Sequence, residues 1–271
     1  MVRPYVICGR PWRHWVGGYR ALHYLCDALN RAGCRAYIAH DETSGYLRTP
    51  SIPEDEVADL GDFIAVYPER VEGNPYRAPV VVRWLLHRPD AHGEPKRFTE
   101  GELVYAWSEL VRPADAGLLW VPTVEVELFD TLREYEREGV CYYVGKGKGD
   151  TLGLGKAGAI HLSHENVPTR EELAGILKRS DLFYCYDNYT LLLWEAGMCG
   201  CPTVLVPSGE FTREQFKASE YGLEGIAWGA EEGEIARAMA TVMARYMLYL
   251  RMQARSLHRL IPEFIERTQN A

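Results

Sequence analysis

The stretch that decides the fold is Asp187-Asn188-Tyr189-Thr190-Leu191-Leu192-Leu193-Trp194-Glu195-Ala196-Gly197-Met198-Cys199-Gly200-Cys201-Pro202. It follows an apolar run at residues 182–186 that predicts a strand. Residues 191–199 predict a helix that is apolar on nearly every side and therefore buried, and Gly200 ends it. Residues 202–206 predict the next strand. A strand, a helix and a second strand in this order indicate a parallel βαβ unit.

Glu195 is the only charged side chain in this buried helix. A buried carboxylate needs a partner, because removing it from water without one costs several kcal/mol. One interpretation is a core glutamate bonded to a backbone amide or an arginine, and the other is a glutamate that binds a ligand. The flanking residues favour a ligand, since Asp187 follows a strand and Asn188 and Thr190 can cap a helix whose N-terminus suits a diphosphate. Glu195 would then accept hydrogen bonds from a ribose diol, with Asp187 nearer to a sugar.

The same alternation of strands and helices extends in both directions from this passage. In the second half, Thr169 and Glu172 have capping-box spacing at the start of a helix predicted for residues 170–180. In the first half, Leu22, Leu25 and Leu29 recur at helical spacing. The other predicted strands are residues 5–9, 35–39, 63–67, 79–86, 103–107, 118–121, 140–145, 159–162 and 226–228. We therefore expect an α/β protein with parallel sheets.

The length of 271 residues fits two small domains. Residues 1–121 predict an N-terminal Rossmann-like domain, and residues 133–250 a second one. Residues 122–132 carry three acidic side chains and no convincing strand, so they predict the linker. Two such halves would place a cleft between the carboxyl ends of their strands.

The chain is predicted to end in helix. An apolar stripe repeats at helical spacing from Ile235 to Leu250 and continues through Leu257, Leu260 and Phe264. Residues 251–271 are expected to pack on the N-terminal domain. Pro262 should kink or break this last piece.

Composition excludes several classes of protein. With 38 acidic and 30 basic side chains, the net charge of −8 argues against a protein that grips nucleic acid. No apolar run approaches the roughly 18–20 residues of a membrane span, and residues 1–9 predict a strand rather than a signal peptide. The seven cysteines are odd in number, which indicates a reducing compartment. Cys199 and Cys201 are the one close pair and lack further ligands at zinc spacing, so we expect no metal and a cytoplasmic protein.

The passage at 187–202 resembles the Glu-x7-Glu motif of family-4-like retaining glycosyltransferases, written Glu-x-Phe-Gly-Leu-x-x-x-Glu-Ala-x-x-x-Gly-x-Pro. Glu195 stands at the second Glu of that motif, which binds the nucleotide ribose, and Asp187 takes the place of the first, which contacts the donor sugar. Tyr189 and Thr190 replace Phe-Gly, so the turn geometry and the sugar are open. The resemblance implies the GT-B fold, in which two Rossmann-like domains face a central cleft and a C-terminal helix returns to the first domain. The chain is short for this family.

Looser matches imply the remaining site residues. Lys146 is similar to the family's Arg in Val-Gly-Arg, and Lys148 is a candidate for the second cation at the diphosphate. A solvated Gly/Lys loop is the open alternative for both. His87, at a predicted strand end, is similar to the family's His that faces the donor sugar, although a surface histidine remains possible.

Three further segments are similar to family passages. Gly17 and Gly18 resemble the glycine loop after the first strand, where backbone approaches the donor phosphates. His164 and Val167 lie where the family's loop holds the nucleobase. Residues 121–129 resemble the interdomain passage but lack its Asn-Gly. Together the resemblance implies Asp187, His87 and Lys146 as catalytic residues, and donor contacts from Glu195, Thr190, Leu191, Lys146, Lys148, Gly17, Gly18, His164 and Val167.

The expected activity is transfer of a sugar from a nucleoside diphosphate sugar to an acceptor hydroxyl, without metal or cofactor. The family implies a retaining outcome, a glycan or lipid-linked acceptor and a role in envelope polysaccharide or glycan synthesis. Two alternatives are a GT-B-shaped sugar-nucleotide epimerase and a non-catalytic sugar-nucleotide-binding or scaffold protein. The basic residues Arg251, Arg255, His258 and Arg259 predict at most a peripheral contact with the inner membrane face, or simply a solvated basic face.

Overall fold

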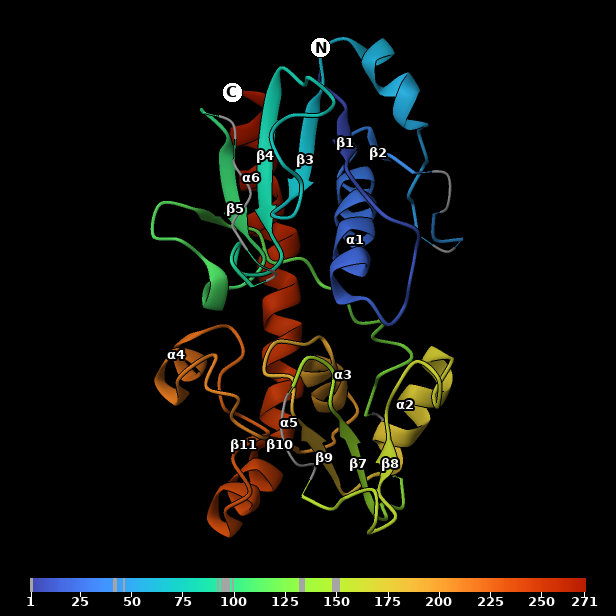
Figure 1. Cartoon of the computed structure of the whole chain (residues 1–271), viewed down its shortest axis with the longest axis vertical. Coiled ribbons are helices and arrows are strands. Elements are labelled where there is room, and N and C mark those ends of the chain that lie inside the picture. Colours follow the sequence, from blue (N-terminus) through green and yellow to red (C-terminus); the bar gives the residue numbers. More distant parts are fainter. Residues whose placement is uncertain are drawn as a thin grey trace. The chain divides into compact units, whose positions relative to one another are not determined.

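The computed structural model describes residues 2–40, 43–45, 47–91, 93, 98, 100–131, 135–147 and 152–271. The chain divides into two compact units. Unit 1 comprises Met1–Thr123 and Gln253–Ala271, and unit 2 comprises Val124–Met252. Each unit is built on one parallel sheet (Figure 1).

Unit 1 contains a six-stranded parallel sheet in the order β2-β1-β3-β4-β5-β6. Helix α1 (Gly17–Arg31) connects the first two strands, and the chain then returns past β1 to start β3 on its other side. This reversal beside β1 is the switch point at which doubly wound sheets bind ligands at their carboxyl ends. The strands are β1 (Tyr5–Ile7), β2 (Ala36–Ile38), β3 (Ile64–Pro68), β4 (Val80–Leu85), β5 (Leu103–Ala106) and β6 (Gly117–Leu118).

The end of the chain completes this first unit. After α5 (Glu232–Arg255), the π-helical segment η3 (Ser256–Leu260) leads into α6 (Ile261–Gln269). Phe264 of α6 packs its ring 5.9 Å from that of Tyr5 and 5.0 Å from that of Tyr105. The hydroxyls of Tyr5 and Thr268 lie 2.7 Å apart in a buried hydrogen bond. The helix therefore covers the sheet with its apolar face.

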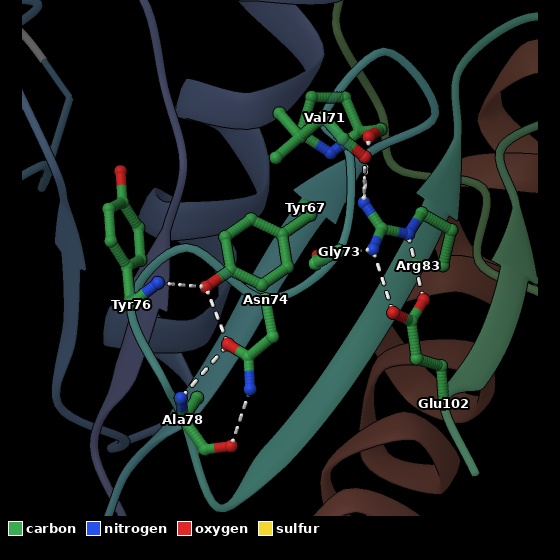
Figure 2. Close-up of polar contacts among 9 residues, drawn as sticks. Tyr67, Val71, Gly73, Asn74, Tyr76, Ala78, Arg83 and Glu102 are labelled. Carbon is green, nitrogen blue, oxygen red and sulfur yellow. Dashed lines mark hydrogen bonds and ion pairs between the residues drawn. The ribbon is translucent and has the colours of Figure 1, made fainter. Parts of the chain in front are cut away.

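The connection from β3 to β4 is a loop whose path is set by a buried arginine on β4. Arg83 is fully buried and makes a bidentate pair with Glu102, with both nitrogen–oxygen distances 2.8 Å. Its guanidinium also donates to the carbonyls of Val71, at 2.6 Å, and Gly73, at 2.8 Å. Figure 2 shows this cation between the loop and the carboxylate. The paired charge thus donates to two half-buried loop carbonyls and fixes the loop against β4.

The far end of the same loop is closed by an asparagine. The Tyr67 hydroxyl donates to Asn74 Oδ1 at 2.9 Å, and the same oxygen accepts the Ala78 amide at 2.9 Å (Figure 2). Asn74 Nδ2 donates to the Ala78 carbonyl, also at 2.9 Å. The loop therefore holds a defined turn without a helix.

Unit 2 contains a five-stranded parallel sheet in the order β11-β10-β9-β7-β8. Its strands are β7 (Val140–Tyr143), β8 (Ile160–His161), β9 (Leu182–Cys185), β10 (Thr203–Leu205) and β11 (Ile226–Trp228). Its helices are α2 (Arg170–Arg179), α3 (Leu192–Met198), α4 (Arg213–Ala218) and most of α5. The capping box of Thr169 and Glu172 is formed as predicted. All seven residues of α3 are buried, as its composition requires.

The predicted strands are all present, most of them one or two residues shorter than expected. Strand β3 is shifted by one residue, from the predicted 63–67 to Ile64–Pro68, and β6, predicted at 118–121, is found at Gly117–Leu118. Two short 3-10 helices, η1 (Glu54–Leu60) and η2 (Glu109–Val111), are present that the sequence pattern does not predict. The π-helical segment precedes Pro262, which lies in the first turn of α6. No helix among the described residues is long and apolar enough to cross a membrane.

Candidate functional site

The turn after β7 and the turn after β9 meet in unit 2, because these strands are parallel neighbours. Gly145 has a φ of 52°, and a Cβ there would lie 2.7 Å from Asp187 Oδ2 and 2.4 Å from the Tyr143 ring. A Cβ on Gly147 would lie 2.3 Å from the Tyr186 carbonyl oxygen. Only glycine fits at these two positions, so they allow the Lys146 backbone to close on Asp187.

Asp187 is a buried carboxyl group held by backbone amides. Its Oδ1 accepts the Tyr189 amide at 3.1 Å, and its Oδ2 accepts the Lys146 amide at 3.3 Å. Burial raises the pKa of Asp187, while the Tyr189 amide and the Lys146 charge act in the opposite direction. The group is therefore fixed in place and less acidic than an ordinary aspartate.

Glu195 is completely buried and has an arginine partner. Arg170, the first residue of α2, donates from Nη2 to Glu195 at 2.8 Å and to Glu125 at 2.5 Å. The guanidinium lies 4.4 Å from the centroid of the Phe129 ring. Burial alone would lower the pKa of Arg170, but the two carboxylates outweigh it and raise that pKa. The interpretation of Glu195 as a core glutamate bonded to an arginine is therefore confirmed for this contact. The Arg170 cation joins the two carboxylates of Glu195 and Glu125.

Arg170 and Phe129 belong to the site but were not predicted as members of it from the sequence. Arg170 was included only as the start of a capped helix, and nothing in its local pattern pointed to a carboxylate 25 residues later. Glu125 offered a signal, because it is one of the three acidic side chains of the predicted linker, residues 122–132.

The segment between Asp187 and α3 differs in part from expectation. Asn188 does not cap the helix: its Nδ2 donates to the Val206 carbonyl at 2.8 Å, and its Oδ1 accepts the Ser208 amide at 2.7 Å. The prediction of Asn188 as a cap was wrong, because the loop after β10 competes for that side chain. Thr190 Oγ1 accepts a hydrogen bond from the Leu192 amide at a long distance of 3.4 Å. Leu191 is the N-cap residue of α3.

The expected nucleobase loop follows β8, which pairs with β7, so it lies at the same sheet edge as Lys146. Val167 is buried and donates its amide to the Ser163 carbonyl at 2.9 Å, whereas His164 is exposed. Lys148 lies outside the described residues. Within the described ranges, no group of three or more His, Cys, Asp or Glu side chains could hold a metal ion.

Three predicted site residues, His87, Gly17 and Gly18, belong to unit 1. In this unit a histidine and a glutamate follow two neighbouring strands, β4 and β3. His87 follows β4 and is buried, and its Nδ1 accepts the Arg88 amide at 2.8 Å, which leaves the proton of the neutral ring on Nε2. Glu69 follows β3, accepts the Leu86 amide at 2.9 Å and was not predicted. Burial raises the pKa of Glu69. The glycines, expected in a loop, begin α1 instead, and Gly18 lies beside Leu86.

Three solved structures share this arrangement of strands and helices. WaaG, a glycosyltransferase involved in lipopolysaccharide biosynthesis, aligns with a TM-score of 0.53 over 98% of this chain and 100% of its own, at 9% identity. A mutant of T4 phage BGT in complex with UDP-glucose aligns with a TM-score of 0.54 over 99% of each chain, at 10% identity. The fold is GT-B.

A third GT-B structure is an alpha-glucosyltransferase in complex with UDP and a 13-mer DNA containing an HMU base. Its TM-score is 0.51 over 95% of this chain and 94% of its own, at 12% identity. No protein-family model matches the sequence, and neither does any curated protein. At these identities the likeness concerns the GT-B fold, and the family-4 resemblance of the 187–202 passage stays a prediction.

Proposed function

We propose that this GT-B chain is a glycosyltransferase that moves a sugar from a nucleoside diphosphate sugar to an acceptor hydroxyl. The observation that carries the proposal is the closure of the 144–147 turn on Asp187, which puts a lysine and a buried carboxyl group at adjacent strand ends. The alignments add support, since two of the similar proteins are solved with UDP or UDP-glucose.

Lys146 would neutralise the diphosphate as it leaves, which is electrostatic stabilisation of developing charge without a metal. Asp187, oriented by two backbone amides, would position the donor sugar. His87 stays a candidate donor of a hydrogen bond from Nε2 to a sugar hydroxyl. In the reaction, the bond between the sugar C1 and the diphosphate breaks, the acceptor oxygen bonds to C1 and its proton departs, and nucleoside diphosphate is released.

Glu195 would bind the ribose diol by giving up its contact with the Arg170 guanidinium. Since Arg170 contacts both Glu195 and Glu125, the guanidinium keeps a carboxylate when Glu195 turns to the ribose. An arginine with only one carboxylate would instead be left as an unpaired buried charge, which is costly. The second carboxylate thus lowers the cost of opening the donor site.

The finer points of the proposal follow the resemblance. Thr190, Leu191, His164, Val167 and Lys148 would contact the donor, and Gly17 and Gly18 would allow close approach of backbone. We propose a retaining, metal-independent reaction in glycan or envelope polysaccharide synthesis, with a glycan or lipid-linked acceptor. The protein would act in the cytoplasm with at most peripheral membrane contact. Likeness to WaaG, involved in lipopolysaccharide biosynthesis, supports that setting.

The test begins with a thermal-shift screen of UDP, GDP, ADP and their sugars, because a ligand that binds only the native state raises the melting temperature. The stabilising donor is then incubated with candidate acceptors. Release of nucleoside diphosphate that requires acceptor supports a transferase. A changed sugar without acceptor would show an epimerase, and binding without either reaction would show a non-catalytic protein. Lys146→Ala should lower turnover more than donor affinity, and full activity in that variant would remove its assigned role.

A further inference from the structure

Unit 1 contains a cavity of about 390 Å³ at the β6 edge of its sheet. Its walls come from β5, β6, the segment after β5 and the helices at the end of the chain. Its charged lining consists of Arg112, Arg255, Arg259, Arg267, Glu109 and Glu263. None of these residues belongs to the candidate donor site, so the cavity needs an explanation of its own.

The charges of this lining do not cancel. Four arginines face two glutamates, so the formal charge is +2 in a chain whose net charge is −8. Arg112 pairs with Glu109 at 2.5 Å, and Arg259 pairs with Glu263 at 2.9 Å. In the part of the chain that the structure describes, neither Arg255 nor Arg267 lies in an ion pair. Two cations of the cavity therefore remain without a carboxylate.

The backbone at this cavity is also unusual. Residues Ser256–Leu260 form a π-helical segment, a conformation that is rare and concentrates at functional sites. Ser256 donates its hydroxyl to the Trp120 carbonyl at 2.6 Å, and Leu260 is buried, so the segment is anchored to the unit. Arg255 directly precedes the segment and Arg259 lies inside it, four positions later, so two like charges stand close together on the helical surface.

We propose that this cavity binds an anionic ligand that carries a phosphate group. The planar guanidinium groups of Arg255 and Arg267 suit bidentate hydrogen bonds to phosphate oxygens, whereas Arg112 and Arg259 already have glutamate partners. The phosphate can belong to a soluble diphosphate or to a phospholipid headgroup, which offer the same oxygens. The proposal stands apart from the glycosyltransferase assignment, because it uses other residues.

The first experiment titrates inorganic pyrophosphate into the full chain by calorimetry. The double variant Arg255→Ala/Arg267→Ala should weaken binding at least tenfold, since it removes two groups that donate charge-assisted hydrogen bonds. Arg35→Ala removes an exposed arginine of the same unit outside the cavity and should leave affinity within twofold. Pyrophosphate bound at the donor site gives a separate binding event, which Lys146→Ala should weaken while leaving the event that requires Arg255 and Arg267. Unchanged melting temperatures confirm that the variants fold.

The second experiment measures flotation with vesicles of phosphatidylglycerol or phosphatidylcholine. Flotation with phosphatidylglycerol only, abolished by the double variant, supports a lipid headgroup as the ligand. Pyrophosphate binding that depends on Arg255 and Arg267, without flotation, supports a soluble ligand. If neither pyrophosphate affinity nor flotation differs between wild type and the double variant, the proposal is wrong.

Discussion

Asp187 and Glu195 show how two acidic residues eight positions apart acquire different properties from their surroundings. Among the described residues, Asp187 accepts hydrogen bonds from the Tyr189 and Lys146 amides, and burial raises its pKa against their effect. Glu195 is more deeply buried but shares the Arg170 cation with Glu125. The first is therefore easier to protonate, and the second belongs to an ion-pair network.

The raised pKa of Asp187 predicts a pH-dependent stability. The unfolded chain releases this proton near the model-peptide pKa of 3.8, while the native state keeps it to higher pH. The native state therefore binds more protons in this window, and its contribution to stability falls as pH rises from 3.8 through the native pKa. Asp187→Asn should remove that loss.

The melting temperatures of wild type and Asp187→Asn, compared from pH 3.5 to 7, measure this effect. The melting temperature of Asp187→Asn should rise relative to that of wild type as pH rises. A constant difference across that range would show that Asp187 is not titrating abnormally. Glu69→Gln provides a matched comparison in unit 1, because burial raises the pKa of Glu69 as well.

Arg170 and Glu195 should differ sharply in their effect on stability. Arg170→Ala leaves two carboxylates facing each other without their cation, so the free energy of unfolding should fall by about 3–5 kcal/mol. Glu195→Ala leaves Arg170 paired with Glu125 and should retain the fold while nucleotide affinity falls at least tenfold. Urea unfolding and calorimetry measure the two quantities. Equal destabilisation by both variants would contradict the sharing of Arg170, and unchanged nucleotide affinity would contradict the donor role.

At the scale of elements, the turn after β7 is decided by its glycines. Gly145 passes Tyr143 and Asp187, and Gly147 passes Tyr186, at distances that exclude a Cβ. Strand β7 needs only an apolar run in order to form. Helix α3 needs only apolar side chains on its buried faces. The turn is thus the element in which a small substitution has the largest expected effect on the site.

Gly145→Ala should both destabilise the protein and reduce turnover. The variant combines a positive φ of 52° with a Cβ only 2.7 Å from Asp187 Oδ2, so we expect a loss of about 2–4 kcal/mol. Gly139→Ala is the matched control, since its φ is 74° but nothing lies within 4 Å of a Cβ. It should cost about 1 kcal/mol and preserve activity. Equal effects in the two variants would show that contact with Asp187 is unimportant.

At the scale of the whole molecule, the chain leaves its first unit at residue 123 and returns to it at residue 253. The returning segment is anchored by apolar and aromatic contacts of α6 with strands from the start and middle of the unit. Stability of unit 1 therefore depends on residues from both ends of the sequence.

Phe264→Ala should lower the free energy of unfolding by about 3–5 kcal/mol, because a fully buried ring between Tyr5 and Tyr105 is replaced by a cavity. Leu257→Ala is a suitable control in the same segment, as Leu257 is 44% exposed. Its effect should stay within about 1 kcal/mol. Similar denaturation curves for the two variants would show that α6 contributes little to unit 1.

Much of the architecture follows from local pattern. The apolar runs predict every strand, the capping box of Thr169 and Glu172 predicts the start of α2, and the buried composition of residues 191–199 predicts α3. Strand ends were less certain, because hydrogen bonding to a neighbour ends a strand and that neighbour is distant in sequence. The π-helical segment before α6 was missed for the same reason, since its anchor is the Trp120 carbonyl.

By itself, the sequence determined the α/β class and the order of the elements, and it marked Asp187 and Glu195 as candidate site residues, because hydrophobic periodicity and the isolation of one charge in an apolar helix are local properties. Only the tertiary structure decided the partners. Arg170 reaches Glu125 across 45 positions, and the Lys146 amide reaches Asp187 across 41. A charged residue in an apolar segment predicts that a partner is needed, because an unpaired buried charge is costly. Which residue is that partner depends on long-range packing.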